Sequence, residues 1–102
     1  AISRQEVFGP LVTVTPFDSE DEAIRLANDS DMGLAASLWT NDLKKTMELT
    51  SRIKAGTVWV NCHNLIDPNM PFGGFKESGI GRDFGVRSLD PYTEVKSVCI
   101  AY

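Results

Sequence analysis

A carboxylate and an aromatic ring lie close together near the start of the chain, in Glu6-Val7-Phe8-Gly9-Pro10. A carboxylate can accept hydrogen bonds from two neighbouring hydroxyl groups, as on a ribose. An aromatic ring can pack behind a flat heterocycle, and the glycine and proline fix a turn after it. The residues alone predict either such a contact or an exposed glutamate beside a core phenylalanine at the entrance to a strand.

The second candidate segment is a glycine-rich loop over residues 71–82, P-F-G-G-F-K-E-S-G-I-G-R. Five of the eight glycines of the chain fall between 73 and 85, so the backbone is expected to make turns that other residues resist. Gly79, Gly81 and Gly85 miss the dinucleotide-binding spacing G-x-G-x-x-G by one residue, and no strand precedes them. Since there is no Walker A pattern either, we exclude phosphate binding and predict a tight structural loop.

The composition disfavours several other kinds of chemistry. Cys62 and Cys99 form no C-x-x-C pair and His63 is the only histidine, so we expect no metal site and two small, buried, reduced thiols. The net charge is −4 and the ten basic residues are spread along the chain, which predicts no nucleic-acid partner. No apolar run approaches the roughly 20 residues that span a bilayer. With no signal-peptide pattern, a cytoplasmic protein without a membrane partner is expected.

Four segments are predicted to be strands. Residues 11–17 alternate apolar and polar side chains, as in a half-buried strand. Residues 34–39 and 57–61 are short apolar runs, as in strands of a covered parallel sheet. Residues 94–102 form a last strand, with Val95, Val98 and Ile100 as its apolar members.

Helices are predicted between these strands. Ser19 and Glu22 form an S-x-x-E capping box, and the helix that begins there is predicted to end between residues 28 and 33. Residues 40–41 can cap a second helix, and a short third helix is predicted within 83–91. The second helix is predicted to have Lys54 in its last turn and Gly56 just past its end. Its apolar face comprises Leu43, Met47, Thr50 and Ile53.

This alternation of strands and helices predicts an α/β fold with parallel strands and crossover helices. Three strands and a tail are few for an independent parallel sheet, because such sheets are covered on both faces. We therefore expect the chain to pack against a part of a protein that is absent from this sequence.

Five segments together resemble, in order, the C-terminal fifth of the aldehyde dehydrogenase superfamily. They are E-V-F-G-P, A-N-D-S-D-M-G-L-A-A-S-L-W-T-N-D, G-T-V-W-V-N, P-F-G-G-F-K-E-S-G-I-G-R and Y-T-E-V-K-S-V. The resemblance extends from Glu6 to Val98, and the order of the motifs makes it far more specific than any one of them. The run V-N-C-H-N-L-I-D-P-N-M-P-F-G-G is most similar to bacterial phenylacetaldehyde dehydrogenases.

The resemblance implies roles for particular residues. Glu6 would hold the hydroxyls of the nicotinamide ribose of NAD or NADP, and Phe8 would pack near the nicotinamide ring. His63, Ile66 and Phe72 would line the tunnel for the aldehyde substrate, although a purely structural role stays open for each. The loop residues that would only brace the structure are Lys76, Ser78, Gly79, Gly81 and Arg82.

The same resemblance divides the chain in two. Residues 1–91 would form the C-terminal part of the catalytic domain, and residues 92–102 an oligomerisation strand and tail. Within the latter, Tyr92 to Ile100 would join a sheet of a neighbouring subunit, so a homodimer or homotetramer is expected.

The catalytic residues of that family have no counterpart here. Neither Cys62 nor Cys99 lies in a G-Q-x-C segment, and the glutamate base, the oxyanion asparagine and the nucleotide-binding domain are missing. We therefore predict no catalytic residue in this chain and no activity without the rest of the same polypeptide. The alternative is a truncated, non-catalytic module that associates with other subunits. The start Ala1-Ile2-Ser3, without an initiator methionine, is compatible with processing and with a chain cut from a longer one.

Overall fold

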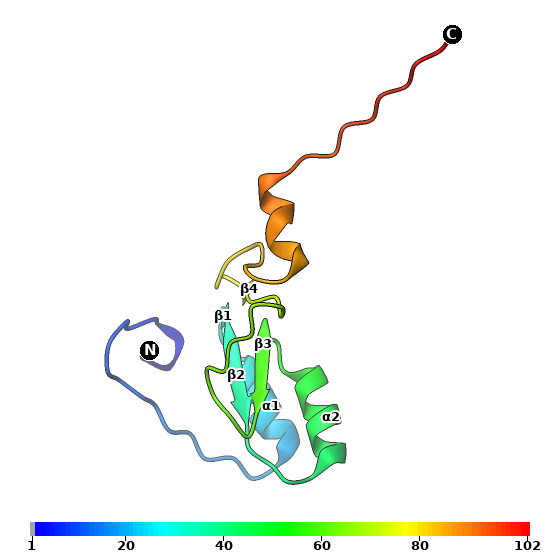
Figure 1. Cartoon of the computed structure of the whole chain (residues 1–102). Helices are drawn as coiled ribbons and strands as arrows, with labels where there is room; N and C mark the ends of the chain where they lie inside the picture. The colour runs from blue at the N-terminus through cyan, green and yellow to red at the C-terminus, as the bar shows by residue number, and fades with distance from the viewer. Residues whose placement is uncertain (1) are drawn as a thin grey trace.

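The centre of the structure is a strand–helix–strand unit, in which β2 (Ala35–Leu38) and β3 (Thr57–Val60) are joined by α2 (Leu43–Arg52). The two strands pair in parallel, with Ala35 opposite Thr57 and Leu38 opposite Val60. The computed structural model describes residues 2–102. The strands predicted at 34–39 and 57–61 are confirmed, and so is an α/β arrangement of mixed helices and strands (Figure 1).

Helix α1 (Glu20–Asn28) begins as its capping box predicts. The Glu22 backbone N–H donates to Ser19 Oγ at 3.2 Å. The Glu22 carboxylate accepts from the backbone N–H of Asp18 at 3.0 Å, one residue before the position that an S-x-x-E box specifies. Such a cap is worth about 1 kcal/mol, because it satisfies helix N–H groups that have no partner within the helix.

Helix α2 begins one residue later than predicted. Its N-cap is Asp42, whose carboxylate accepts from the backbone N–H of Lys45 at 3.1 Å. The predicted cap at residues 40–41 is wrong, because the Thr40 hydroxyl accepts from the Asp42 backbone N–H at 3.1 Å. Thr40 therefore shapes the turn that leads into the helix.

The buried face of α2 also differs from the prediction. Leu43 is 75% exposed and Met47 69% exposed, whereas Leu49 is 7% exposed. Ile53, a member of the predicted face, and Leu49, which the prediction omitted, line a groove of about 560 Å³ that is also lined by α1 and β2. The predicted stripe joined apolar residues by spacing alone, and the contact with α1 and β2 selects a neighbouring face of the helix.

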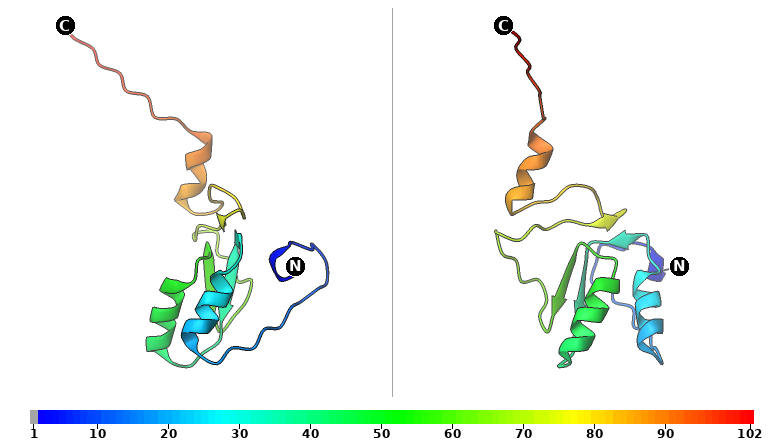
Figure 2. Two further views of the ribbon diagram at one scale, coloured as in Figure 1. Left: turned by 180° about the vertical axis from the view of Figure 1, so that it is seen from behind. Right: turned by 90° about the vertical axis from the view of Figure 1, so that its right-hand side faces the viewer.

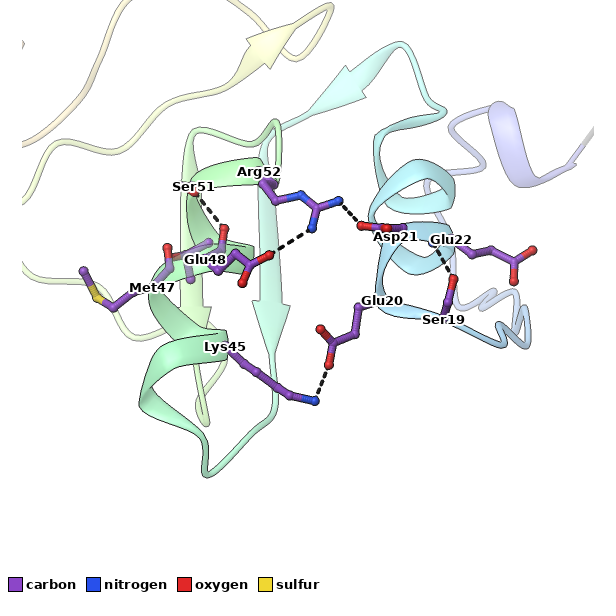
Figure 3. A network of polar contacts seen from close by, with 10 residues as sticks. Ser19, Glu20, Asp21, Glu22, Lys45, Met47, Glu48, Ser51 and Arg52 are labelled. Carbon is purple, nitrogen blue, oxygen red and sulfur yellow. Dashed lines mark hydrogen bonds and ion pairs between the residues drawn. The ribbon is translucent and has the colours of Figure 1, made fainter.

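Ion pairs connect α1 and α2, which lie side by side (Figures 2 and 3). Arg52 lies 2.5 Å from Asp21 on α1 and 3.4 Å from Glu48 on its own helix, and Lys45 pairs closely with Glu20. The hydrogen bond and charge of Glu20 raise the pKa of Lys45, and those of Asp21 raise the pKa of Arg52. These exposed pairs orient the helices but contribute little to the free energy of folding.

The end of α1 is held by residues far away in the sequence. The Asn28 side chain donates to the Arg52 carbonyl at 2.9 Å and accepts from the Lys54 backbone N–H at 2.8 Å. The Lys76 ammonium donates to the carbonyls of Asn28 at 2.9 Å and Ser30 at 2.6 Å. A cation at this end of a helix also complements the helix dipole, so Lys76 serves as a C-terminal cap.

Two very short strands, β1 (Met32–Gly33) and β4 (Phe75–Lys76), pair antiparallel and connect the glycine-rich loop to the end of α1. The sequence did not predict them, since two residues carry no periodicity. Beyond them, η2 (Val86–Tyr92) is a 3-10 helix, where a helix ending before Pro91 was predicted. At the other end of the chain, η1 spans Ile2–Arg4.

The strands predicted at 11–17 and 94–102 are not formed. Both segments are extended but exposed along their whole length, and Figure 1 shows the second projecting away from the rest of the molecule. Their alternating side chains are typical of strands, but a strand also needs a neighbour with which to exchange backbone hydrogen bonds. Within residues 2–102 no such neighbour lies beside either segment.

The chain buries little of its own apolar surface. Only Leu49 and Trp59 are buried large hydrophobic residues among those described. The radius of gyration is 18.0 Å and the extents are 70 × 33 × 23 Å, whereas a compact chain of this length has a radius of about 13 Å. The exposed area of 8681 Å² likewise exceeds the about 5,700 Å² of a compact protein of this mass. Within residues 2–102, no helix has the length and apolarity required to cross a membrane.

Candidate functional site

Glu6 and Phe8 lie on one hollow near the N-terminus. The hollow has a volume of about 290 Å³ and is formed by η1 and the extended segment after it. Phe8 is 94% exposed. Among residues 2–102, no ion pair or hydrogen bond engages the Glu6 carboxylate. An exposed ring and a carboxylate without a protein partner are thus available to a ligand from outside the chain.

The backbone at Phe8 has a φ of +49°, in the left-handed region. For a bulky residue this conformation costs about 1–2 kcal/mol relative to the ordinary regions. The turn at Gly9, where the Leu11 backbone N–H donates to the Gly9 carbonyl at 2.7 Å, follows directly. Backbone strain of this kind is concentrated at ligand-binding segments.

A second group of candidate residues follows β3. Asn61 fixes the start of this loop, because its side chain accepts from the Thr40 backbone N–H at 2.9 Å and donates to the Thr40 carbonyl at 2.8 Å. Asn61 and Asn64 have φ values of +56° and +57°, which asparagine tolerates better than other residues with a side chain. The loop therefore leaves the sheet through two sharp, defined turns.

Ile66 and Phe72 line a common cavity of about 250 Å³ between β3 and this loop. Trp59 also lines it, and its ring stacks on Phe72 with ring centroids 6.5 Å apart. His63 is not part of the lining. Its ring lies edge-on to Trp59 at 5.2 Å, and its Nδ1 is hydrogen-bonded to Ser37 Oγ at 2.8 Å. The predicted tunnel residues thus fall into a pair on the cavity and a histidine beside it.

The glycine-rich loop packs against the rest of the chain by close backbone contacts. A Cβ on Gly56 would come within 1.6 Å of the Gly73 carbonyl oxygen, and one on Gly74 within 2.5 Å of Ser78 Cβ. Ser78 Oγ accepts from the Gly33 backbone N–H at 2.8 Å, and the Arg82 guanidinium donates to the Gly74 carbonyl at 3.1 Å. These contacts brace the loop against β1 and the start of β3.

The two cysteines are separate and lie in different surroundings. Cys62 is half-buried and lines the cavity of Ile66 and Phe72, whereas Cys99 is exposed in the C-terminal segment. The prediction of a buried thiol is wrong for Cys99, because this residue lies in an exposed segment that projects away from the rest of the molecule (Figure 1). In the same part of the chain, no group of three or more histidine, cysteine and carboxylate side chains could hold a metal ion.

Sequence reasoning missed two residues of this region. Trp59 was identified only as part of a strand, although it contacts three residues of the following loop: His63, Leu65 and Phe72. Ser37 gave no signal, because a lone serine in an apolar strand has no motif, and its link to His63 spans 26 residues of sequence.

The chain matches the model of the aldehyde dehydrogenase family over residues 1–98, and it therefore belongs to that family. It is 52% identical over 98 residues to a phenylacetaldehyde dehydrogenase of Pseudomonas fluorescens, covering 96% of this chain and 20% of the relative. It is 48% identical over 101 residues to the NADP/NAD-dependent aldehyde dehydrogenase PuuC of Escherichia coli, covering 99% and 20%.

A solved structure shows the same arrangement of these elements. The indole-3-acetaldehyde dehydrogenase AldA of P. syringae, in complex with NAD+ and IAA, matches with a TM-score of 0.91 and 47% identity. The match covers 95% of this chain and 20% of that protein. The chain thus spans about a fifth of the length of the relatives that it matches.

Proposed function

We propose that the chain acts as the C-terminal part of the catalytic domain of an NAD(P)-dependent aldehyde dehydrogenase, which oxidises an aldehyde to a carboxylic acid. The observation that carries this proposal is the match of nearly the whole chain to one fifth of an enzyme of known structure. The exposed apolar surface and the unpaired extended segments support it, because a segment removed from a larger domain exposes such surface. The cysteine nucleophile, the base and the oxyanion donor would come from the rest of the same polypeptide.

Glu6 and Phe8 are proposed to contact the cofactor. NAD+ or NADP+ supplies the acceptor for the hydride that leaves the aldehyde carbon. The free Glu6 carboxylate can accept hydrogen bonds from the two ribose hydroxyls and so fix the sugar. The exposed Phe8 ring can pack near the nicotinamide and restrict its orientation. The hollow that the two residues share supports this role.

Ile66 and Phe72 are proposed to form part of the wall of the aldehyde tunnel. Their cavity is mainly apolar and has an aromatic floor of Trp59 and Phe72, which suits a phenyl-bearing aldehyde. His63 is proposed as a further contact at the edge of this wall. The name of the Pseudomonas fluorescens relative supports an aromatic aldehyde, and a screen of aldehydes would identify the substrate.

The segment 92–102 is proposed to be an oligomerisation strand in a homodimer or homotetramer. It is extended, and its backbone N–H and carbonyl groups from residue 94 onward have no partner within the described residues. Such an edge can add to a sheet of a neighbouring subunit. A cytoplasmic location stays a prediction.

A chimera tests these proposals. Residues 1–98 of this chain replace the matching segment of the Pseudomonas fluorescens enzyme, and NAD+-dependent oxidation of phenylacetaldehyde is measured. We expect activity, and we expect Glu6→Gln to raise KM for NAD+ about tenfold or more, because it removes a charged acceptor. Glu48→Gln, on α2 and outside this hollow, is the control and should leave KM for NAD+ unchanged. An inactive but folded chimera, or equal effects of the two substitutions, would contradict the proposal.

A further inference from the structure

Two side chains of the sheet hold the loop that follows β3. Ser37 on β2 and Trp59 on β3 lie opposite one another in the register of the parallel pair. Ser37 Oγ is hydrogen-bonded to Nδ1 of His63 at 2.8 Å, and the Trp59 indole N–H donates to the Leu65 carbonyl at 2.8 Å. The two anchors therefore hold the first and last residues of the tripeptide His63-Asn64-Leu65.

The residue between the anchors is the one with constrained backbone. Asn64 has a φ of +57°, a conformation that one side-chain anchor on each side can maintain. The next residue after the second anchor is Ile66, which lines the cavity with Phe72. Displacing His63 would therefore change the course of the chain immediately before a residue of the cavity wall.

The Trp59 ring connects both anchors to the opposite wall. It meets the His63 ring edge-on at 5.2 Å and stacks on Phe72 at 6.5 Å. Phe72 in turn is fixed by two backbone hydrogen bonds of 2.8 Å with Asp83. The rings of His63, Trp59 and Phe72 are therefore in contact in series, which connects the position of His63 to Phe72 on the far side of the cavity.

We propose that Ser37 is a positioning residue that sets substrate selectivity, because its hydrogen bond to His63 fixes the loop carrying Ile66. This inference rests on the proposed role of the cavity in binding the aldehyde. Ser37 itself does not line that cavity. Its loss should therefore affect aldehydes large enough to touch Ile66 and Phe72, and should affect a two-carbon aldehyde less.

The effect of Ser37 on substrate selectivity can be measured in the chimera with the Pseudomonas fluorescens enzyme. Ser37→Ala removes the hydroxyl, whereas Ser37→Thr keeps it on a side chain that suits a strand. Ser51→Ala is the matched control, because among residues 2–102 the Ser51 hydroxyl bonds only to the Glu48 carbonyl of its own helix. KM and kcat are measured for phenylacetaldehyde and for acetaldehyde, and hydrogen exchange is followed at the backbone amides of residues 61–66.

We expect Ser37→Ala to raise KM for phenylacetaldehyde about 2- to 10-fold, the loss expected for one neutral hydrogen bond. KM for acetaldehyde should rise less, kcat should change little, and amides 61–66 should exchange faster. Ser37→Thr should restore both readouts, and Ser51→Ala should change neither. Equal effects on the two aldehydes, or unchanged exchange at 61–66, would overturn the proposal.

The exchange readout separates this inference from the proposed function. If the chimera is inactive but Ser37→Ala still speeds exchange at residues 61–66, the result would count against the proposed aldehyde binding. It would still support the role of Ser37 in holding the loop. If Ser37→Ala does not fold, His63→Phe gives the same test, because it keeps the ring against Trp59 and removes the nitrogen that Ser37 binds. Exchange at residues 61–66 of that variant no faster than in the unsubstituted chimera would also overturn the proposal.

Discussion

Gly56 is the position where the smallest change should have the largest effect. It lies just before β3, and its backbone N–H donates to the Gly33 carbonyl at 3.0 Å. A Cβ at Gly56 would lie 1.6 Å from the Gly73 carbonyl oxygen and 2.7 Å from its carbonyl carbon. Restoring an ordinary contact of 3.4 Å would displace the loop from β3 by about 1.8 Å. No side-chain rotation can relieve this, since both partners are backbone.

The loss of stability in Gly56→Ala can be gauged from comparable substitutions. Overpacking a tight site typically costs about 1–3 kcal/mol when side chains can adjust. Here the displacement would also weaken the hydrogen bond to Gly33 and move Phe72 and Arg82 with the loop. We therefore expect Gly56→Ala to reduce the free energy of unfolding of the chimera by about 3 kcal/mol or more.

The assay compares Gly56→Ala with Gly9→Ala by soluble yield and thermal unfolding. Gly9 is a suitable control, because a Cβ there meets its nearest atom, the Val7 carbonyl oxygen, at 3.9 Å and its φ is not positive. Gly9→Ala should change stability by no more than about 0.5 kcal/mol. If Gly56→Ala unfolds at the same temperature as the Gly9 control, the close packing of the glycine-rich loop on β3 is refuted.

Two further predictions concern the helices and the isolated chain. Glu20 raises the pKa of Lys45 above its ordinary value of 10.5, so the pair stabilises the fold fully below that pH and loses its contribution as pH rises through the raised pKa. The melting temperature of the unsubstituted protein should therefore fall more steeply above pH about 10.5 than that of Lys45→Met. Lys44→Met is the control and should keep the steeper fall. Identical pH profiles for all three proteins would contradict the pairing. The isolated chain, with its exposed apolar residues and unpaired edges, should aggregate, oligomerise or be partly unfolded, and a sharp monomer peak with cooperative unfolding would argue against this.

Local features of the fold were predictable because they depend on neighbouring residues. The cap of α1 follows from Ser19 and Glu22, and the strands β2 and β3 follow from their short apolar runs. Segments 11–17 and 94–102 have equally good strand patterns, but pairing needs a second strand, which the described residues do not provide. The sequence of a segment can therefore indicate that a strand is possible without providing its partner.

The candidate site was predictable to a different extent at each end. The chemistry of Glu6 and Phe8 alone left an ordinary strand entrance open, and only the ordered motifs predicted a cofactor contact, which stays a prediction. Ile66 and Phe72 came from the same motifs, and the structure brings them to one cavity. The hydrogen bond of Ser37 to His63 was not predictable, since it joins residues on different elements and has no periodic or motif signal.

We propose that this chain contributes to aldehyde oxidation only as part of a longer polypeptide. The most direct test compares NAD(P)-linked oxidation of phenylacetaldehyde by three purified proteins: the isolated chain, the Pseudomonas fluorescens enzyme lacking its matching segment, and the chimera. We predict that the chimera oxidises phenylacetaldehyde and that the other two proteins show no turnover at any pH tested. Turnover by the isolated 102-residue chain would contradict the account, because the chain would then have to supply a nucleophile and a base of its own.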